Sequence, residues 1–472
     1  MRRRLVVVAA LWAAGCSQAP LAPPPAVPLA MAFKESQGPW TSAAPADTLP
    51  RQAWWKLYQD AELDALEQRL LDNSPDLATA FARYQQARAE TGALRAAQSP
   101  TLGASLNGQR DRQSERRPLR VLGPNSPDEY NSATLGLELD YEIDLWGRVR
   151  QRVSAGVAQE QAAAADLAAA RLSLQAQLAD SLVALRGLDQ EVQLLRETEA
   201  AYARAEEMIA RRHQNGIASG LDLARAQAQL ETTRSQVGQS QAQRALLEHA
   251  IAALVGASAS SFSIEPRLVP ATVPTVPPGL PAALLQRRPD IAAAQRRVAA
   301  ANATVGVART AFFPSLTLSG AAGFQSSDLA HFIEAPNLFW AIGPSLLIDV
   351  LDGGRRDANI ARAQAQLDEA GQRYRAVVLA AFQQVEDQLA LLARYGEAAA
   401  ADGRAAQAAQ RAQDMATERY QQGAVSYLDV VTAQTANLQA RRSLLDLATR
   451  QRRASVQLVR ALGGGWTAAS LD

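Results

Sequence analysis

The sequence predicts a mainly α-helical protein with membrane-inserted β-strands, built as an internal tandem repeat. Three observations support this fold class. Landmark residues recur at constant distances in the two halves of the chain, each half has two segments in which apolar and polar residues alternate, and long runs rich in Ala, Gln, Arg and Leu contain no proline. Alternation with a period of two is typical of strands, and those four residue types favour helices.

The repeat is defined by landmarks at fixed offsets. Pro75 and Pro100 bound a helical segment, and Pro289 and Pro314 bound its equivalent, so the offset is 214 residues at both ends. Later landmarks keep an offset of 207, and these are Trp146 with Gly353, Gly216 with Gly423, Leu221 with Leu428, and Val255 with Leu462. We therefore divide the mature chain into a first repeat over residues 51–270 and a second over 271–472.

Each repeat is expected to contain two strands, at about 101–112 and 132–144 and again at about 315–326 and 338–350. Apolar residues alternate there with a polar set that includes Glu138, Asp140 and Glu142. Four strands cannot close a barrel, since the smallest transmembrane barrels have about eight, and an open edge in lipid leaves N–H and C=O groups unpaired. The strands must then close with copies of themselves, two chains giving about eight and three about twelve. A soluble sheet with one wet face is the alternative.

A helical hairpin follows the strands in each repeat, over about 148–255 and about 355–462, with breaks at Gly216 and Gly423. The long arm of about 65 residues would measure about 100 Å. Alanines bury little area each, so we expect no bulky core but a collective assembly such as a hollow tube of helices, with an ordinary Ala-rich coiled coil as the alternative. No apolar run long enough for a transmembrane helix follows the first twenty residues.

The first residues are typical of an export signal. A basic start at Met1 to Arg4 precedes an apolar run, and small residues lead to Cys16, the single cysteine of the chain. Residues 1–15 are therefore a predicted signal peptide, and 16–50 a Pro-, Ala- and Ser-rich tether with little packing of its own. Ala13-Ala14-Gly15-Cys16 resembles the lipobox of bacterial lipoproteins, which implies acylation of Cys16, and Ser17 after it implies the outer membrane. An ordinary signal peptide with an incidental thiol is the alternative.

Composition excludes several classes of function. With 48 basic and 47 acidic residues, the chain lacks the basic excess of a nucleic-acid-binding protein. The three histidines are far apart and have no ligand-spaced partners, so no metal site is expected. There is no nucleophile motif or phosphate loop, and Gly353-Gly354 lacks the dinucleotide-binding pattern. We expect no enzyme and no cofactor beyond the covalent lipid.

Motifs in both repeats together resemble a known family. They are Trp54-Trp55 with Tyr58, Asp60, Leu63 and Leu66; Asn73 to Leu77; Tyr141 to Arg148; Leu285 to Ile291 with Phe312 to Ser315; Gly343 to Ser345; Asp352 to Arg356; and Gly423 to Val430. This set resembles the TolC-like outer-membrane factor family in its NodT-type efflux lipoprotein branch, and the resemblance covers nearly the whole mature chain. Ala61 departs from the family, which often has proline there.

The resemblance implies a homotrimer that shares a twelve-stranded transmembrane β-barrel and a long periplasmic α-helical barrel. It implies a passive exit duct for drugs or small molecules in a tripartite efflux pump. The partners would be a periplasmic membrane-fusion adaptor and an inner-membrane transporter of the resistance-nodulation-division (RND) class. The expected location is the cell outer membrane, with a lipid anchor and a large periplasmic portion. A channel for type I protein secretion and a structural periplasmic coiled coil are the alternative functions.

The resemblance also assigns roles at the hairpin tips. The residues expected to contact the adaptor are Asn215, Gly216, Gln422 and Gly423. Asp222 and Asp429, just past the tips, would form an acidic ring that narrows the closed pore and attracts cations. The alternative for these two aspartates is charge at a helix N-terminus, which complements the helix dipole. Arg211, Arg212 and Tyr420 would either lock the tips by polar contacts or form a solvated face.

Overall fold

A computed structural model of the chain describes residues 32–36, 53–114, 128–269, 273–274, 276 and 284–466. The chain forms two compact units, and each takes segments from both sequence repeats. The strand unit comprises Tyr84–Ala163 and Ala294–Tyr374. The helical unit comprises the described residues of Ala26–Arg83, Ala164–Ala293 and Arg375–Asp472. The sequence repeats and the compact units are therefore different divisions of the chain.

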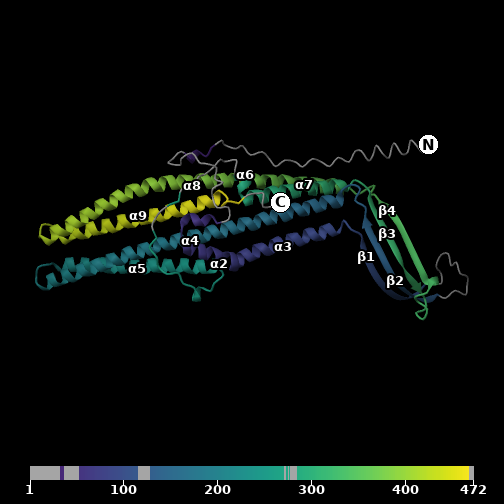
Figure 1. Cartoon of the computed structure of the whole chain (residues 1–472), viewed down its shortest axis with the longest axis horizontal. Coiled ribbons are helices and arrows are strands. Elements are labelled where there is room, and N and C mark those ends of the chain that lie inside the picture. Colours follow the sequence, from purple (N-terminus) through teal and green to yellow (C-terminus); the bar gives the residue numbers. More distant parts are fainter. Residues whose placement is uncertain are drawn as a thin grey trace. The chain divides into compact units, whose positions relative to one another are not determined.

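Helices and strands follow one another in the same order in both repeats (Figure 1). The first repeat contains α2 (Ala61–Asn73), α3 (Pro75–Ala96), β1 (Thr101–Arg112), β2 (Glu129–Glu142), α4 (Arg148–Gln214) and α5 (Gly220–Leu254). The second contains α6 (Leu284–Arg287), α7 (Pro289–Thr310), β3 (Ser315–Ser326), β4 (Leu338–Leu347), α8 (Arg355–Gln421) and α9 (Tyr427–Ala461). Both long helices have 67 residues and both returning helices have 35, so the predicted internal repeat is confirmed.

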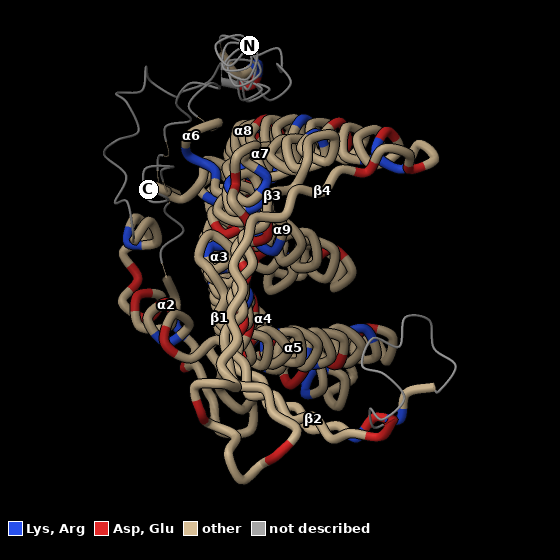
Figure 2. Tube along the Cα trace, turned by 90° about the vertical axis from the view of Figure 1, so that its right-hand side faces the viewer, with Lys and Arg blue, Asp and Glu red and all other residues tan. Residues whose placement is uncertain are grey.

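The four strands form one antiparallel sheet in the order β1-β2-β3-β4 (Figure 1). The register places Leu102 opposite Leu139 and Gly103 opposite Glu138, so one face is apolar and the other polar. Side chains on the apolar face are 64–73% exposed in the single chain at Leu102, Leu106, Trp340 and Ile342. Figure 2 shows that β3 and β4 carry no charged residue. The predicted two-faced strands are therefore confirmed.

Three strand boundaries differ from the sequence prediction. β2 begins three residues earlier, at Glu129, and ends two residues earlier, at Glu142, and β4 ends three residues earlier, at Leu347. The chain leaves β4 because the aspartates that follow turn toward α8. Asp349 pairs with Arg355 at 2.9 Å, and Asp352 accepts a hydrogen bond from the N–H of Arg356 at 3.1 Å.

Several residues of the family motifs form contacts at the junction between strands and helices. Asp144 accepts hydrogen bonds from the backbone N–H groups of Val149 at 3.1 Å and Arg150 at 2.9 Å, so it caps the start of α4. Trp146 donates its Nε1–H to the carbonyl of Pro314 at 2.7 Å and stacks on Phe313, with 4.9 Å between ring centroids. These contacts hold the β2–α4 corner against the α7–β3 corner.

The helical unit has a bulky core, contrary to the sequence prediction. Trp54 packs edge to face on Trp55 and Tyr58, with ring centroids 6.2 and 6.4 Å apart, and the Tyr58 hydroxyl is 2.8 Å from that of Ser455. Aliphatic residues of α2, α4, α8 and α9 complete this core, among them Leu63, Leu70, Leu178, Leu185, Leu389 and Val459. The prediction was wrong because overall alanine content hides large residues that folding gathers in one place.

A short part of the predicted tether also packs. Phe33 is 4% exposed and belongs to the core, and the backbone N–H groups of Lys34 and Glu35 donate to the carboxylate of Glu386 on α8 at 2.7 and 2.9 Å. The expectation that residues 16–50 pack little is therefore wrong at this point. Cys16, the predicted lipidation site, lies outside the described residues.

Helix α8 contains an 18-residue window that is apolar enough to cross a membrane, although the sequence analysis expected none. Val378, Ala381, Val385 and Leu389 recur at helical spacing, and each is 0% exposed. These residues form a buried stripe on one side of the helix, although only 28% of the apolar window is buried in the single chain.

Candidate functional site

Both helical hairpins turn through a glycine in the left-handed conformation. Between α4 and α5, Gly216 has φ +76° and donates its N–H to the backbone carbonyl of His213 at 2.9 Å. Between α8 and α9, Gly423 has φ +78° and donates its N–H to the backbone carbonyl of Tyr420 at 3.0 Å. A side chain at either position would be strained, so the two turns depend on glycine.

The predicted tip residues form an accessible surface. Asn215, Gly216, Gln422 and Gly423 are all exposed, as the expectation of a docking role requires. Apolar side chains stand beside them, with Ile217 68%, Leu221 59% and Leu428 47% exposed. In the sequence, Leu221 and Leu428 are matched landmarks of the repeat, but the exposure of these three side chains at the tips was not predicted, although apolar residues in a polar turn are a signal of such a surface.

Asp222 and Asp429 are the third residues of the returning helices, next to the N-cap residues Ser219 and Ser426. Ser219 accepts a hydrogen bond from the Asp222 N–H at 3.1 Å and donates its hydroxyl to the Asp222 carboxylate at 2.8 Å. Ser426 donates both its hydroxyl, at 2.8 Å, and its backbone N–H, at 3.0 Å, to the Asp429 carboxylate. This is a capping box, with aspartate in place of the usual glutamate. The alternative role at a helix N-terminus therefore has a structural basis in both helices.

The two carboxylates differ in their surroundings. Asp222 is half-buried and lies 3.7 Å from Arg225, whereas Asp429 is exposed. Asp429 forms no ion pair with any residue that the structure describes. The Asp429 charge is therefore the more accessible of the two.

All four long helices contribute to a small cluster at the tips. Its fully buried members are Ile209, Ala226, Tyr427 and Val430. Above them, the Arg212 guanidinium lies 5.1 Å from the Tyr420 ring centroid, and the Tyr420 and Tyr427 rings are 5.4 Å apart. Arg212 and Tyr420 thus connect the α4–α5 hairpin to the α8–α9 hairpin by a cation–π contact. Arg211 instead lies 3.5 Å from Glu207 of its own helix.

The tyrosines of this cluster stay protonated at physiological pH. Burial raises the pKa of Tyr427 to about 12, and the nearby Tyr420, Tyr202 and Asp222 add to the shift. Burial also raises the pKa of Tyr420, although the Arg212 charge opposes it. The contact between Arg212 and Tyr420 is therefore insensitive to pH in the physiological range.

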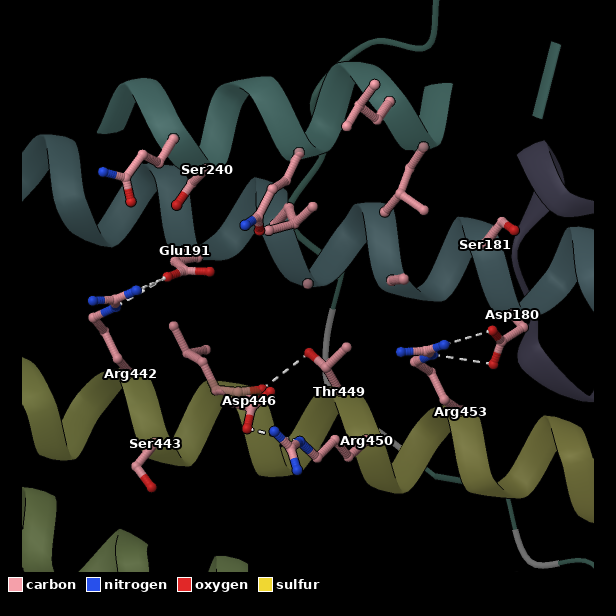
Figure 3. A pocket seen from close by; sticks show the side chains of 18 of the residues that line it. Asp180, Ser181, Glu191, Ser240, Arg442, Ser443, Asp446, Thr449, Arg450 and Arg453 are labelled. Carbon is pink, nitrogen blue, oxygen red and sulfur yellow. Dashed lines mark hydrogen bonds and ion pairs between the residues drawn. The ribbon is translucent and has the colours of Figure 1, made fainter. Parts of the chain in front are cut away.

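Farther from the tips, three acidic residues of α4 face three arginines of α9 (Figure 3 shows the first two pairs). The pairs are Asp180–Arg453 at 2.8 Å, Glu191–Arg442 at 2.6 Å and Glu197–Arg441 at 3.9 Å. The first two pairs of this charge ladder border a cavity of about 1000 Å³ between α4, α5 and α9. The ladder could not be predicted from the sequence, because its first two pairs join residues 273 and 251 positions apart and the sequence does not show the register of α4 on α9.

Glycine allows a close approach of α4 to α9 within the ladder. A Cβ added at Gly187 would lie 2.5 Å from Oγ1 and 2.7 Å from Cγ2 of Thr449. The helices pack at this distance only because position 187 has no side chain.

The polar residues predicted for the second strand lie on one face of the sheet. Asp140 accepts a hydrogen bond from the Ser319 hydroxyl at 3.1 Å, and Glu142 accepts one from Arg148 Nε–H at 2.7 Å. Glu138 has no hydrogen-bond or ion-pair partner for its side chain among the described residues. In the described part of the chain, no three His, Cys, Asp or Glu side chains are close enough to hold a metal ion.

A two-faced antiparallel sheet joined to a pair of long helical hairpins defines a class of outer-membrane channels. The chain belongs to the outer membrane efflux protein family, whose model matches residues 66–257 and 280–464. It is 32% identical to the outer membrane protein OprJ of Pseudomonas aeruginosa, over 97% of this chain and 94% of OprJ. It is also 32% identical to the pyoverdine export outer membrane protein OpmQ of the same species, over 97% and 95% of the two chains. With the cation efflux system protein CusC of Escherichia coli it shares 29% identity, over 97% of each chain.

Solved structures agree with this assignment. The outer-membrane channel OprN matches with a TM-score of 0.86 and 28% identity, over 94% of this chain and 99% of OprN. The CmeC outer membrane channel of Campylobacter jejuni matches with a TM-score of 0.86 and 25% identity, over 96% of each chain. The predicted resemblance and fold class are therefore confirmed, and the protein is an outer-membrane channel with a periplasmic helical portion.

Proposed function

We propose that the chain is the exit duct of a tripartite efflux pump. It passively conducts small molecules from the periplasm to the outside, while an inner-membrane pump supplies the energy. The observation that carries this function is the two-faced sheet, since its apolar face suits lipid and its polar, acidic face suits a water-filled pore.

The open edges of the sheet support a homotrimer. β1 and β4 are the edge strands, and their outward N–H and C=O groups need partners in a membrane. Edge-to-edge joining of three copies would give about twelve strands and a closed wall, within the range of known membrane barrels. The same joining would bring three pairs of helical hairpins together as a periplasmic helical barrel.

The exposed tips support docking to a periplasmic adaptor. Asn215, Gly216, Gln422 and Gly423 would form the polar part of this contact, with Ile217 and Leu428 as apolar neighbours. An adaptor that binds there would link the duct to an inner-membrane transporter, which we propose to be of the RND class. The names of the relatives, which refer to efflux or export, favour this assignment over type I protein secretion.

Asp222 and Asp429 would also set the ion preference of the closed tip. In a trimer, three copies of each would form acidic rings, and the accessible carboxylate of Asp429 would contribute more than the paired Asp222. Capping and ring formation are compatible, because a capping carboxylate keeps its charge.

We also propose that Cys16 is acylated and anchors the chain in the outer membrane. Several acyl chains give a stable membrane anchor. Incorporation of a palmitate analogue into the wild-type chain, and its loss in Cys16→Ser, would support this modification. Labelling of the variant at the wild-type level would contradict it.

The cargo is proposed only as a class, drugs or other small molecules. Related channels are named for cargoes as different as pyoverdine and cations, so the family leaves the cargo open. No enzymatic step is proposed for this chain.

Efflux by a reconstituted pump tests the function. The chain would be expressed with its adaptor and transporter in a Gram-negative host without its own outer-membrane duct, and accumulation of a fluorescent efflux dye would be measured. We expect lower accumulation with the chain than without it, and loss of the difference when the transporter is inactivated. Equal accumulation with and without the chain, at normal expression of all three components, would contradict the exit-duct function.

A further inference from the structure

We propose that the polar face of the sheet carries a binding site for organic cations that contain an aromatic group. The site is formed by the ring of Phe339 and the carboxylate of Glu138. The inference rests on the proposed function, in which this face lines the pore.

The register places Phe339 on the polar face of the sheet. Phe339 pairs with Gly323, Gly323 with Gly136, and Gly136 with Ser105. Directly opposed residues of neighbouring strands share a face. Phe339 therefore lies on the same face as Ser105 and Glu138, whereas Trp340 and Ile342 lie on the apolar face.

The Phe339 ring reaches toward a glycine two strands away. Gly136 is the one buried residue of β2, a strand that the structure describes in full. A Cβ added at Gly136 would lie 3.9 Å from Cζ of Phe339, so the ring reaches across Gly323 and covers Gly136. The tip of the ring therefore lies close to the backbone at Gly136, and an aromatic ring stands on a polar surface.

The ring borders a hollow of about 340 Å³ on this face. Polar side chains supply most of the remaining wall, among them Ser105, Asn107, Gln109, Thr134, Glu138 and Gln325. The hollow therefore combines an aromatic surface with hydroxyl, amide and carboxylate groups, as expected for a molecule with both an apolar and a polar part.

The charges on this face select for cations. Four acidic residues lie on the polar face, namely Asp111, Glu138, Asp140 and Glu142. The neighbouring Arg110 and Arg112 lie on the opposite face. Asp140 and Glu142 are engaged by Ser319 and Arg148, but the Glu138 carboxylate is free of partners in the described structure. A free carboxylate beside an aromatic ring attracts an organic cation by charge and by the quadrupole of the ring, and repels an anion.

Fluorescence titration of the detergent-purified full-length protein with ethidium, an aromatic cation, tests the site. We expect Phe339→Leu and Glu138→Gln each to weaken binding about two- to fivefold, as for exposed cation–π contacts and ion pairs. The Glu138→Gln effect should disappear at about 1 M KCl, where charge is screened within about 3 Å. Phe339→Tyr should keep wild-type affinity because it keeps the ring.

Phe324→Leu is the matched control, since Phe324 pairs with Leu338 in the next register row and lies on the apolar face. Its affinity should equal that of the wild type. Wild-type affinity for ethidium in Phe339→Leu and Glu138→Gln variants that remain trimeric would overturn the site and leave the exit duct intact. A wild-type protein that never forms a trimer would overturn the proposed function, and the site with it.

Discussion

The carboxylates of Asp222 and Asp429 combine a capping role with a proposed role in the pore, and substitution can separate the two. We expect Asp222→Ala with Asp429→Ala to cost about 1 kcal/mol at the Asp429 capping box, to raise leak and to weaken cation selectivity, because the acceptors for Ser219 and Ser426 and both charges are lost. Asp222→Asn with Asp429→Asn keeps an acceptor oxygen for the helix N-terminus and should weaken selectivity alone.

Conductance and reversal potential in planar bilayers would measure both effects. Alanine and asparagine variants that conduct and select as the wild type does would contradict a role for these carboxylates in the closed pore. A leak in the alanine variant alone, with wild-type selectivity in the asparagine variant, would assign them to capping only.

Glu67 is a second residue whose behaviour follows from its surroundings. Its side chain is fully buried in the helical unit, and neither carboxylate oxygen has a hydrogen-bond partner among the described residues. Burial raises the pKa of Glu67 to about 9 from its usual 4.5, with Arg171 opposing the shift and Asp64 adding to it. Between these two values the unfolded chain loses a proton that the folded chain keeps, so the free energy of unfolding falls as pH rises.

We therefore expect Glu67→Gln to raise the melting temperature by several degrees at about pH 8 and to change it little at about pH 4. Circular dichroism of the detergent-solubilised protein would measure this. Asp72→Asn, at an exposed position of the same helix, is the control and should have no such pH dependence. A Glu67→Gln variant that is no more stable than the wild type at about pH 8 would show that the carboxyl is solvated or paired.

Among the elements, the contact between α4 and α9 depends on the charge ladder. The Glu191–Arg442 pair is half-buried, with side chains 22% and 32% exposed, and we expect a coupling of about 1 kcal/mol that weakens with salt. Thermal unfolding of Glu191→Gln, Arg442→Gln and the double variant would measure it. The exposed Arg394–Glu397 pair of α8 is the matched control and should show almost no coupling. Equal coupling in the two pairs would contradict a special role for the ladder.

The same contact also depends on Gly187. We expect Gly187→Ala to destabilise the protein by about 1–3 kcal/mol, because the new Cβ overlaps the Thr449 side chain. Thr449→Ala removes the two nearest atoms and should recover part of that loss when the two substitutions are combined. A Gly187→Ala variant with wild-type thermal stability would show that α4 and α9 can separate at no cost.

The helices and strands differ in how well their positions could be predicted from the sequence. The long helices and the strands are set by local periodicity and by prolines and glycines, so β1, β3 and the hairpin glycines Gly216 and Gly423 could be predicted. The boundaries of β2 and β4 depend on contacts with following residues, such as Asp352, and were displaced by up to three residues. The core around Trp54 and the charge ladder depend on pairing between distant segments, which periodicity does not encode.

The candidate site was predictable to a similar extent. Arg212 and Tyr420 could be placed near the tips because both lie within a few residues of a hairpin glycine. Their direct contact, and the burial of Tyr427 beneath them, could not be derived, because both require the two hairpins to be packed together. Alternation with Trp340 and Ile342 places Phe339 on the polar face, but its position next to Gly136 could not be derived, because it depends on the register of three strands.

For the whole molecule, the open sheet is the feature that requires assembly. A single chain leaves both sheet edges unpaired and large apolar side chains exposed, for instance Trp340 at 73%. The apolar side chains suit lipid, but the unpaired backbone groups of the sheet edges are not stable there, so the chain must complete its wall with further copies. Closure by three copies is the central claim, because the pore, the acidic rings and the Phe339 site all depend on it.

Electron microscopy of the detergent-extracted protein, with its mass measured on the same sample, tests this claim most directly. The account predicts particles with three-fold symmetry and the mass of three chains. Particles with two-fold symmetry, or monomers under conditions that preserve the fold, would contradict it.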